Sequence, residues 1–176
     1  TRRMGFVQPT EGYVNFSWLR ATIGDRVVGA WFDHIECTPQ NFVDQAYLSV
    51  LAGARELTLF RLGDLMENHP GDAALAAALP HLQELARRVQ AAEGRRRGIP
   101  CYKPPGSDPA DNLYLMDYLT MMGLPILPVA RFPEDARVLC LGAQAAADPR
   151  LQSRLDAALE RGALVLATPA LVRALG

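Results

Sequence analysis

Cysteine, lysine and long apolar runs are all scarce in this chain of 176 residues. Its three cysteines lie far apart without a CxxC pair, which argues against a disulfide framework or a zinc site and favours reduced thiols in the cytoplasm. No apolar run reaches the roughly 18 residues that a membrane-spanning helix needs. No apolar segment follows the first residues, so we expect no secretory signal peptide. Because the sequence does not begin with Met, we expect a piece of a longer chain.

The charge balance and the absent motifs exclude further classes. A net charge of -1 lacks the basic excess of a general nucleic-acid binder, and 49% hydrophobic residues is too many for a disordered chain. Neither GxGxxG nor GxxxxGK[ST] occurs, and the lone His69 has no ligand partner four residues on. We therefore expect a globular protein with no cofactor, no metal, and no nucleic-acid or membrane partner.

The first half predicts a strand–helix–strand unit. The apolar run at 27–32 is typical of a buried strand, and residues 56–60 are expected to form a second strand. Between them, Thr38 and Pro39 form a helix start, and Gly53 is placed to end that helix. So short a crossover predicts two parallel, adjacent strands. Residues 1–26, with aromatic residues among Gly, Pro and Asn, are expected to be irregular.

A long helical pattern and a charged segment follow. Residues 72–92 carry an apolar stripe at helical spacing, and Pro80 is expected to kink or split this helix. His81 is expected on its surface. Residues 94–98 (GRRRG) are the best domain boundary in the sequence, interpreted as a solvated linker, with a phosphate-binding patch as the alternative.

The second half repeats the alternation of strands and helices, which predicts the α/β class. Asp148 and Pro149 are interpreted as the cap of a helix. Cys140 lies in an apolar run and is interpreted as a buried, unreactive thiol. Strands are expected at 99–102, 125–129, 137–141 and 163–167, and helices over 113–123 and after Asp148.

Polar side chains follow both expected strands of the first half, where parallel α/β folds place their sites. A carboxylate held near an arginine stays ionised at neutral pH, as a nucleophile or an electrostatic stabiliser must. The alternative is that these charges only cap the strand ends and face water. The residues are Asp33, His34 and Glu36 after the first strand and Arg61, Asp64, Glu67 and His69 after the second.

Three segments of the first half together resemble a glycoside-hydrolase barrel. They are residues 35–39 (IECTP), 51–61 (LAGARELTLFR) and 69–71 (HPG). The family they resemble is that of bacterial beta-galactosidases, in which a catalytic (β/α)8 barrel precedes a trimerisation domain. Residues 111–114 (DNLY), 123–125 (GLP) and the expected strand at 137–141 resemble that next domain more loosely.

The resemblance implies an α/β fold in three parts. Residues 1–93 would be the C-terminal βαβ part of a (β/α)8-type barrel, and 94–98 a linker. Residues 99–176 would be a flavodoxin-like (class I glutamine-amidotransferase-like) α/β domain, shorter than a complete one. The barrel and trimerisation domain further imply a carbohydrate substrate and a homo-oligomer.

The resemblance also implies a function, which is retaining hydrolysis of a beta-galactoside-like glycoside by the full-length protein. Glu36 matches the nucleophile at the end of the seventh strand, in a segment that reads Glu-Cys here where Glu-Gln is common. Arg61 and His69 match residues near the sugar, and Asp33 and Trp31 complete the expected substrate site, with Trp18 as a second candidate platform. Because the general acid belongs to an earlier strand that this chain does not contain, we expect the chain alone to be inactive.

Two other functions remain open on the sequence. The first is a non-catalytic α/β module that mediates oligomerisation or binds a small ligand at its strand ends. The second is a glutamine-amidotransferase-type hydrolase, which is disfavoured because no Gly-x-Cys-x-Gly elbow occurs.

Overall fold

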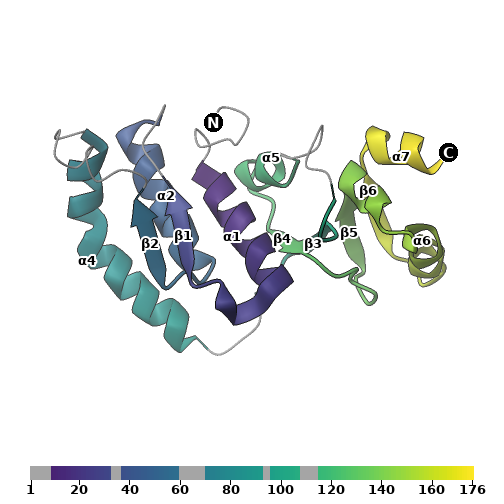
Figure 1. Ribbon diagram of the computed structural model, residues 1–176, viewed down its shortest axis with the longest axis horizontal. Coiled ribbons are helices and arrows are strands. Elements are labelled where there is room, and N and C mark those ends of the chain that lie inside the picture. The colour runs from purple at the N-terminus through teal and green to yellow at the C-terminus, as the bar shows by residue number, and fades with distance from the viewer. Residues whose placement is uncertain (1–8, 33–36, 60–69, 93–95, 108–114) are drawn as a thin grey trace. The chain divides into compact units, whose positions relative to one another are not determined.

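The computed structural model describes residues 9–32, 37–59, 70–92, 96–107 and 115–176. The chain divides into two compact units, Thr1–Arg95 and Arg96–Gly176. Both are mixed α/β units with parallel sheets, as the alternating pattern predicts (Figure 1). None of the helices in the described ranges is long and apolar enough to cross a membrane.

The first unit contains a two-stranded parallel sheet. Strands β1 (Gly29–Phe32) and β2 (Glu56–Leu59) pair in register, with Ala30 opposite Leu57. Helix α2 (Pro39–Leu51) joins them, and this confirms the predicted βαβ unit. Thr38 caps α2, because its Oγ1 accepts a hydrogen bond of 3.1 Å from the Asn41 N–H, and Gly53 ends the helix turn at a φ of 93°.

Helices α1 (Pro9–Ile23), α2 and α4 (Pro70–Ala91) all pack on one face of this sheet. Phe16 of α1 packs with Ala30, whereas apolar side chains of α2 and α4 pack with Leu57. Ala30 and Leu57 are paired residues of parallel strands, so their side chains point to the same side of the sheet. The three helices that pack with them therefore form one layer. On the other face, Glu56 and Thr58 are exposed. Among the described residues, α1, α2 and α4 alternate in sequence with β1 and β2 and lie on the same side of the sheet.

The expectation that residues 1–26 are irregular is wrong from Pro9 onward, because 9–23 form α1 and 24–26 form η2, a short 3-10 helix. The helix lacks a regular apolar stripe, so its periodicity gave no signal. It is stabilised instead by tertiary packing, with Phe16 and Ser17 buried. Arg20 also binds the turn after α2, since its Nη1 donates to the Gly53 carbonyl at 2.9 Å.

Helix α4 continues through Pro80 as one helix and is not split. Pro80 has no N–H, so the Ala76 carbonyl lacks its usual donor within the helix. Both residues are exposed, and water can therefore satisfy that carbonyl. His81 is exposed, as expected. The apolar stripe is confirmed at Leu75 and Leu82, which are buried.

The second unit contains a four-stranded parallel sheet with the spatial order β4-β3-β5-β6. Helices α6 (Leu151–Glu160) and α7 (Pro169–Leu175) and a 3-10 helix, η3 (Ala143–Ala147), contribute apolar side chains to one core, around Leu139 and Leu141. Helix α5 (Leu115–Met121) packs near β4. The strands are β3 (Ile99–Tyr102), β4 (Ile126–Val129), β5 (Val138–Leu141) and β6 (Leu164–Ala167), close to the predicted ranges.

The predicted cap at Asp148 and Pro149 is wrong in its detail. Helix α6 begins at Leu151, its N-cap position is Arg150, and that position has no side-chain capping bond. Asp148 instead accepts hydrogen bonds from the Arg150 N–H at 3.0 Å and from the Tyr102 hydroxyl at 3.0 Å. Asp148 therefore keeps a local hydrogen bond just before α6 and adds a tertiary partner that the sequence did not suggest.

Candidate functional site

The two strands of the first unit end level with each other, because Phe32 pairs with Leu59. They therefore end at one edge of the sheet, the edge at which parallel α/β folds place their sites. The segments that follow them in sequence are 33–36 and 60–69. These segments contain the predicted residues Asp33, Glu36, Arg61 and His69, together with His34, Asp64 and Glu67. All of them lie outside the described residues.

Trp31 is the one predicted site residue whose backbone is described. It lies in β1 and pairs with Thr58 of β2, one position before the strands end. The Thr58 side chain is exposed on the sheet face that carries no helix in the described part of the unit. Sequence reasoning missed Thr58, although β2 reads Glu-Leu-Thr-Leu and this alternation places Thr58 on the face opposite to the leucines. Trp18, the second candidate platform, lies half-buried in α1 within the helical layer.

Side-chain hydrogen bonds hold the segment that follows Glu36 in sequence. The buried Gln45 side chain donates a hydrogen bond of 3.3 Å from its Nε2 to the Cys37 Sγ. The Thr38 cap then fixes the first turn of α2, and Pro39 occupies the first helical position. Two contacts therefore hold the chain within two residues of Glu36, at the amino end of α2.

The second unit has a buried polar cluster that sequence reasoning missed. Asp148 accepts a hydrogen bond of 2.5 Å from Arg154 Nη1 in addition to the Tyr102 hydroxyl. The Arg154 guanidinium lies 5.5 Å from the centroid of the Phe132 ring, and Tyr102 meets Phe132 edge-on at 5.4 Å. No sequence spacing links these four residues, so no motif could have found them.

The hydrogen bonds of this cluster set the ionisation states of Asp148 and Tyr102. Burial alone would raise the pKa of Asp148, but the hydrogen bonds from the Arg150 N–H, Tyr102 and Arg154 outweigh burial and lower it. Burial and the hydrogen bond to Asp148 raise the pKa of Tyr102 to about 12. Asp148 is therefore ionised and Tyr102 neutral at neutral pH. We interpret the cluster as structural, because its groups are mutually satisfied.

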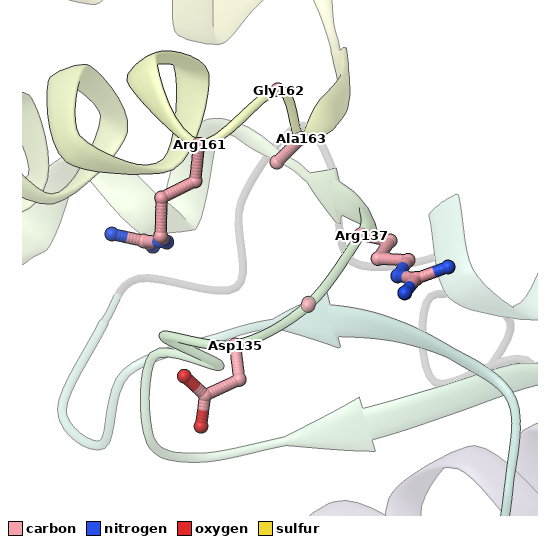
Figure 2. A pocket seen from close by; sticks show the side chains of 6 residues that line it. Asp135, Arg137, Arg161, Gly162 and Ala163 are labelled. Atoms are coloured by element: carbon pink, nitrogen blue, oxygen red, sulfur yellow. The ribbon is translucent and has the colours of Figure 1, made fainter.

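A cavity of about 200 Å³ lies at the amino ends of β5 and β6 (Figure 2). It is lined by Asp135, Arg137 and Arg161 with neighbouring small residues, and the two guanidinium groups point away from each other. Arg161 donates through Nη2 to the Glu134 carbonyl. This edge is opposite to the carboxyl ends of the strands, where α/β folds place their ligands. The charged side chains that line this cavity therefore do not point toward a common position for a substrate.

No group of three or more His, Cys, Asp or Glu side chains within the described ranges has the geometry of a metal site. Cys140 is buried, as predicted, and pairs in register with the buried Cys101 of β3.

The comparison with known families decides the class of the first unit. A family model described as "Probable glycosyl hydrolase, catalytic domain" matches residues 1–94, which is more than half of the chain. The chain belongs to this family. The match confirms the expectation of a glycoside-hydrolase-like protein, and residues 95–176 lie outside it. No curated protein and no solved structure gives a significant match to the chain.

Proposed function

We propose that residues 1–93 are the last strands and helices of a (β/α)8-type catalytic barrel. The supporting observation is that α1, α2 and α4 all pack on one face of a parallel sheet, in a segment that matches a glycosyl hydrolase catalytic domain. In such a barrel the helices form the outer layer and the other sheet face points inward. The exposed Thr58 and Glu56 would then belong to the barrel interior.

In this proposal the full-length protein hydrolyses a glycoside with retention, and Glu36 is the nucleophile. The Glu36 carboxylate attacks the anomeric carbon and forms a covalent glycosyl-enzyme while the leaving group departs. The acid that protonates the leaving group, about 5 Å from the nucleophile, comes from an earlier barrel strand. Water then releases the sugar. The level ends of β1 and β2 favour this arrangement, because they start the segments of Glu36 and Arg61 at one edge.

The remaining site residues have distinct proposed roles. Arg61 keeps a neighbouring carboxylate ionised at neutral pH. Trp31 offers a flat apolar surface to the sugar ring, and Asp33 and His69 bind its hydroxyl groups. The specificity for a beta-galactoside, like a location in the cytoplasm, is proposed on the sequence resemblance alone.

We propose for residues 99–176 a flavodoxin-like, amidotransferase-like domain that mediates homo-oligomerisation without catalysis, with 94–98 as the linker. The order β4-β3-β5-β6 corresponds to strands 2-1-3-4 of a flavodoxin-like sheet, which supports this assignment. Leu164 and Leu166 of the edge strand β6 are 57% and 46% exposed, which favours an apolar contact there. The alternative is a non-catalytic α/β module for oligomerisation or small-ligand binding, and the same two exposed leucines support its oligomerising form.

The test is a chimaera in which the first six barrel strands of a bacterial beta-galactosidase are followed by the whole 176-residue chain. Its turnover is measured on a panel of aryl glycosides. We expect the folded chimaera to hydrolyse a beta-galactoside, and Glu36→Gln to remove the activity. The isolated chain should be inactive on the same panel. Full activity of the Glu36→Gln chimaera would refute the role of Glu36.

A further inference from the structure

Two buried cysteines lie side by side in the sheet of the second unit. Cys101 of β3 and Cys140 of β5 are paired residues of neighbouring parallel strands, so both side chains project from the same face. Cys101 is 0% exposed and Cys140 is 4% exposed. Both are free thiols. These are two of the three cysteines of the chain, and the function proposed above makes no use of them.

We propose that this pair is a modification site, at which hydrogen peroxide converts the Cys101 and Cys140 thiols to an intramolecular disulfide that joins β3 to β5. Paired residues of neighbouring strands have Cα atoms about 4.8 Å apart. That spacing lies inside the range of about 4.4–6.8 Å found in disulfides. The bond can therefore form between strands that are already hydrogen-bonded neighbours.

The two thiols differ in exposure, which favours Cys140 as the first to react, and the directions of their pKa shifts agree with that order. The hydrogen bond from Cys101 lowers the pKa of Cys140, although burial opposes the change. The same hydrogen bond, together with burial, raises the pKa of Cys101. Both directions favour Cys140 as the attacking thiol, in agreement with its greater exposure.

Access also favours Cys140 as the first to react. It pairs with Leu166 of the edge strand β6, whose side chain is 46% exposed, whereas Cys101 lies on the strand between β4 and β5. A small oxidant such as hydrogen peroxide needs only a slight opening beside Leu166. A bulky reagent such as a maleimide needs much more room, so slow maleimide labelling of the native protein is expected as well.

The reaction balances in two steps. The Cys140 sulfur attacks one peroxide oxygen, the O–O bond breaks, and the departing hydroxide takes the thiol proton to form water, leaving a sulfenic acid. The Cys101 sulfur then attacks the Cys140 sulfur, the S–O bond breaks, and the second hydroxide leaves as water with the Cys101 proton. Two thiols are oxidised by two electrons, and one hydrogen peroxide is reduced to two waters.

The test treats the native 176-residue chain with hydrogen peroxide, removes the excess with catalase, and alkylates the denatured protein. Cleavage after arginine places Cys37, Cys101 and Cys140 in the separate peptides 27–55, 98–131 and 138–150. We expect the number of alkylated thiols to fall by two, and peptides 98–131 and 138–150 to appear as one species that a reducing agent separates. Free thiols in both peptides, or sulfinic acids without the linked species, would overturn the proposal.

Three variants check the order of attack. Cys37→Ser should form the linked species as wild type does. Cys101→Ser should stop at the sulfenic acid, which dimedone traps on peptide 138–150, whereas Cys140→Ser should lose the linkage and most of the trapping. Dimedone on Cys101 rather than Cys140 would overturn the proposed order. The wild-type peptide result decides the linkage itself, even where a serine variant fails to fold.

Discussion

The Tyr102 hydroxyl donates a buried hydrogen bond of 3.0 Å to the Asp148 carboxylate, across 46 residues of sequence. This contact joins the end of β3 to the segment before α6. Its energetic weight is testable, because a phenylalanine keeps the ring that meets Phe132 and removes only the donor.

We expect Tyr102→Phe to lower the free energy of unfolding of the second unit by about 1.5–3 kcal/mol, as is typical of a hydrogen bond to a charged group. Urea unfolding at neutral pH measures it. Tyr118→Phe is the matched control, since Tyr118 is 52% exposed, and it should change the free energy by less than about 0.5 kcal/mol. Equal effects of the two substitutions would contradict the account.

The same pair makes the stability of the second unit sensitive to alkaline pH. The pKa of Tyr102 is raised from 10.0 to about 12 in the folded protein. The folded state therefore holds its proton more tightly, so this stabilisation is complete below pH 10 and is lost as the pH rises towards 12. Unfolding measured across that window should show a steeper loss for wild type than for Tyr102→Phe. Parallel curves would disprove the linkage.

Gly98 has no room for a side chain. A Cβ at this position would lie 2.3 Å from the Pro125 carbonyl oxygen, in the backbone that leads into β4. Because a backbone atom cannot rotate away, Gly98→Ala should destabilise the second unit by about 1–3 kcal/mol. Gly12→Ala in α1 is the control, since its Cβ would make only an ordinary contact of 3.5 Å with Ser49 Oγ, and alanine favours helix by about 0.5–1 kcal/mol. Thermal unfolding should shift in opposite directions for the two variants.

The Thr38 cap should contribute measurably to the first unit. Thr38→Ala removes the acceptor for the Asn41 N–H and is expected to cost about 1 kcal/mol. Thr38→Ser keeps the hydroxyl oxygen and should retain most of that stability. Chemical unfolding followed by circular dichroism compares the two variants, and an equal loss in both would exclude the capping bond as the cause.

The segment between the two units should be the first site of proteolysis. Arg96 and Arg97 are exposed and lie at the start of the second unit. Brief trypsin treatment should therefore give two fragments that meet near residue 96, each then more slowly degraded. Early cleavage inside both units, with this segment intact, would contradict the proposed linker at 94–98.

Local signals account for the parts of the fold that the sequence predicts well. Thr38-Pro39 and Gly53 define α2 by capping and turn chemistry, so the flanking strands and their parallel pairing follow from short-range rules. Helix α1 has no such signal, because its stability comes from Phe16 and Ser17 buried against other elements. The role of Asp148 was missed for the same reason, since its partner is 46 residues away.

The candidate site was predictable only in its position along the chain. Level strand ends follow from the βαβ pattern, and they identify the segments of Glu36 and Arg61. Sequence spacing does not give the distance between carboxylates, which depends on the other strands of the proposed barrel. The alternation Glu-Leu-Thr-Leu indicated the covered face of β2, whereas the covered face of β1 required the packing of Ala30.

The role of Glu36 is tested most directly by trapping the covalent intermediate. The folded chimaera described above is treated with an activated 2-deoxy-2-fluoro-beta-galactoside, whose leaving group departs without a general acid, and the labelled peptide is identified by mass spectrometry. The account predicts one sugar per chain on peptide 27–55, attached to Glu36, and no label in Glu36→Gln. A label on another carboxylate, or equal labelling of Glu36→Gln, would contradict it.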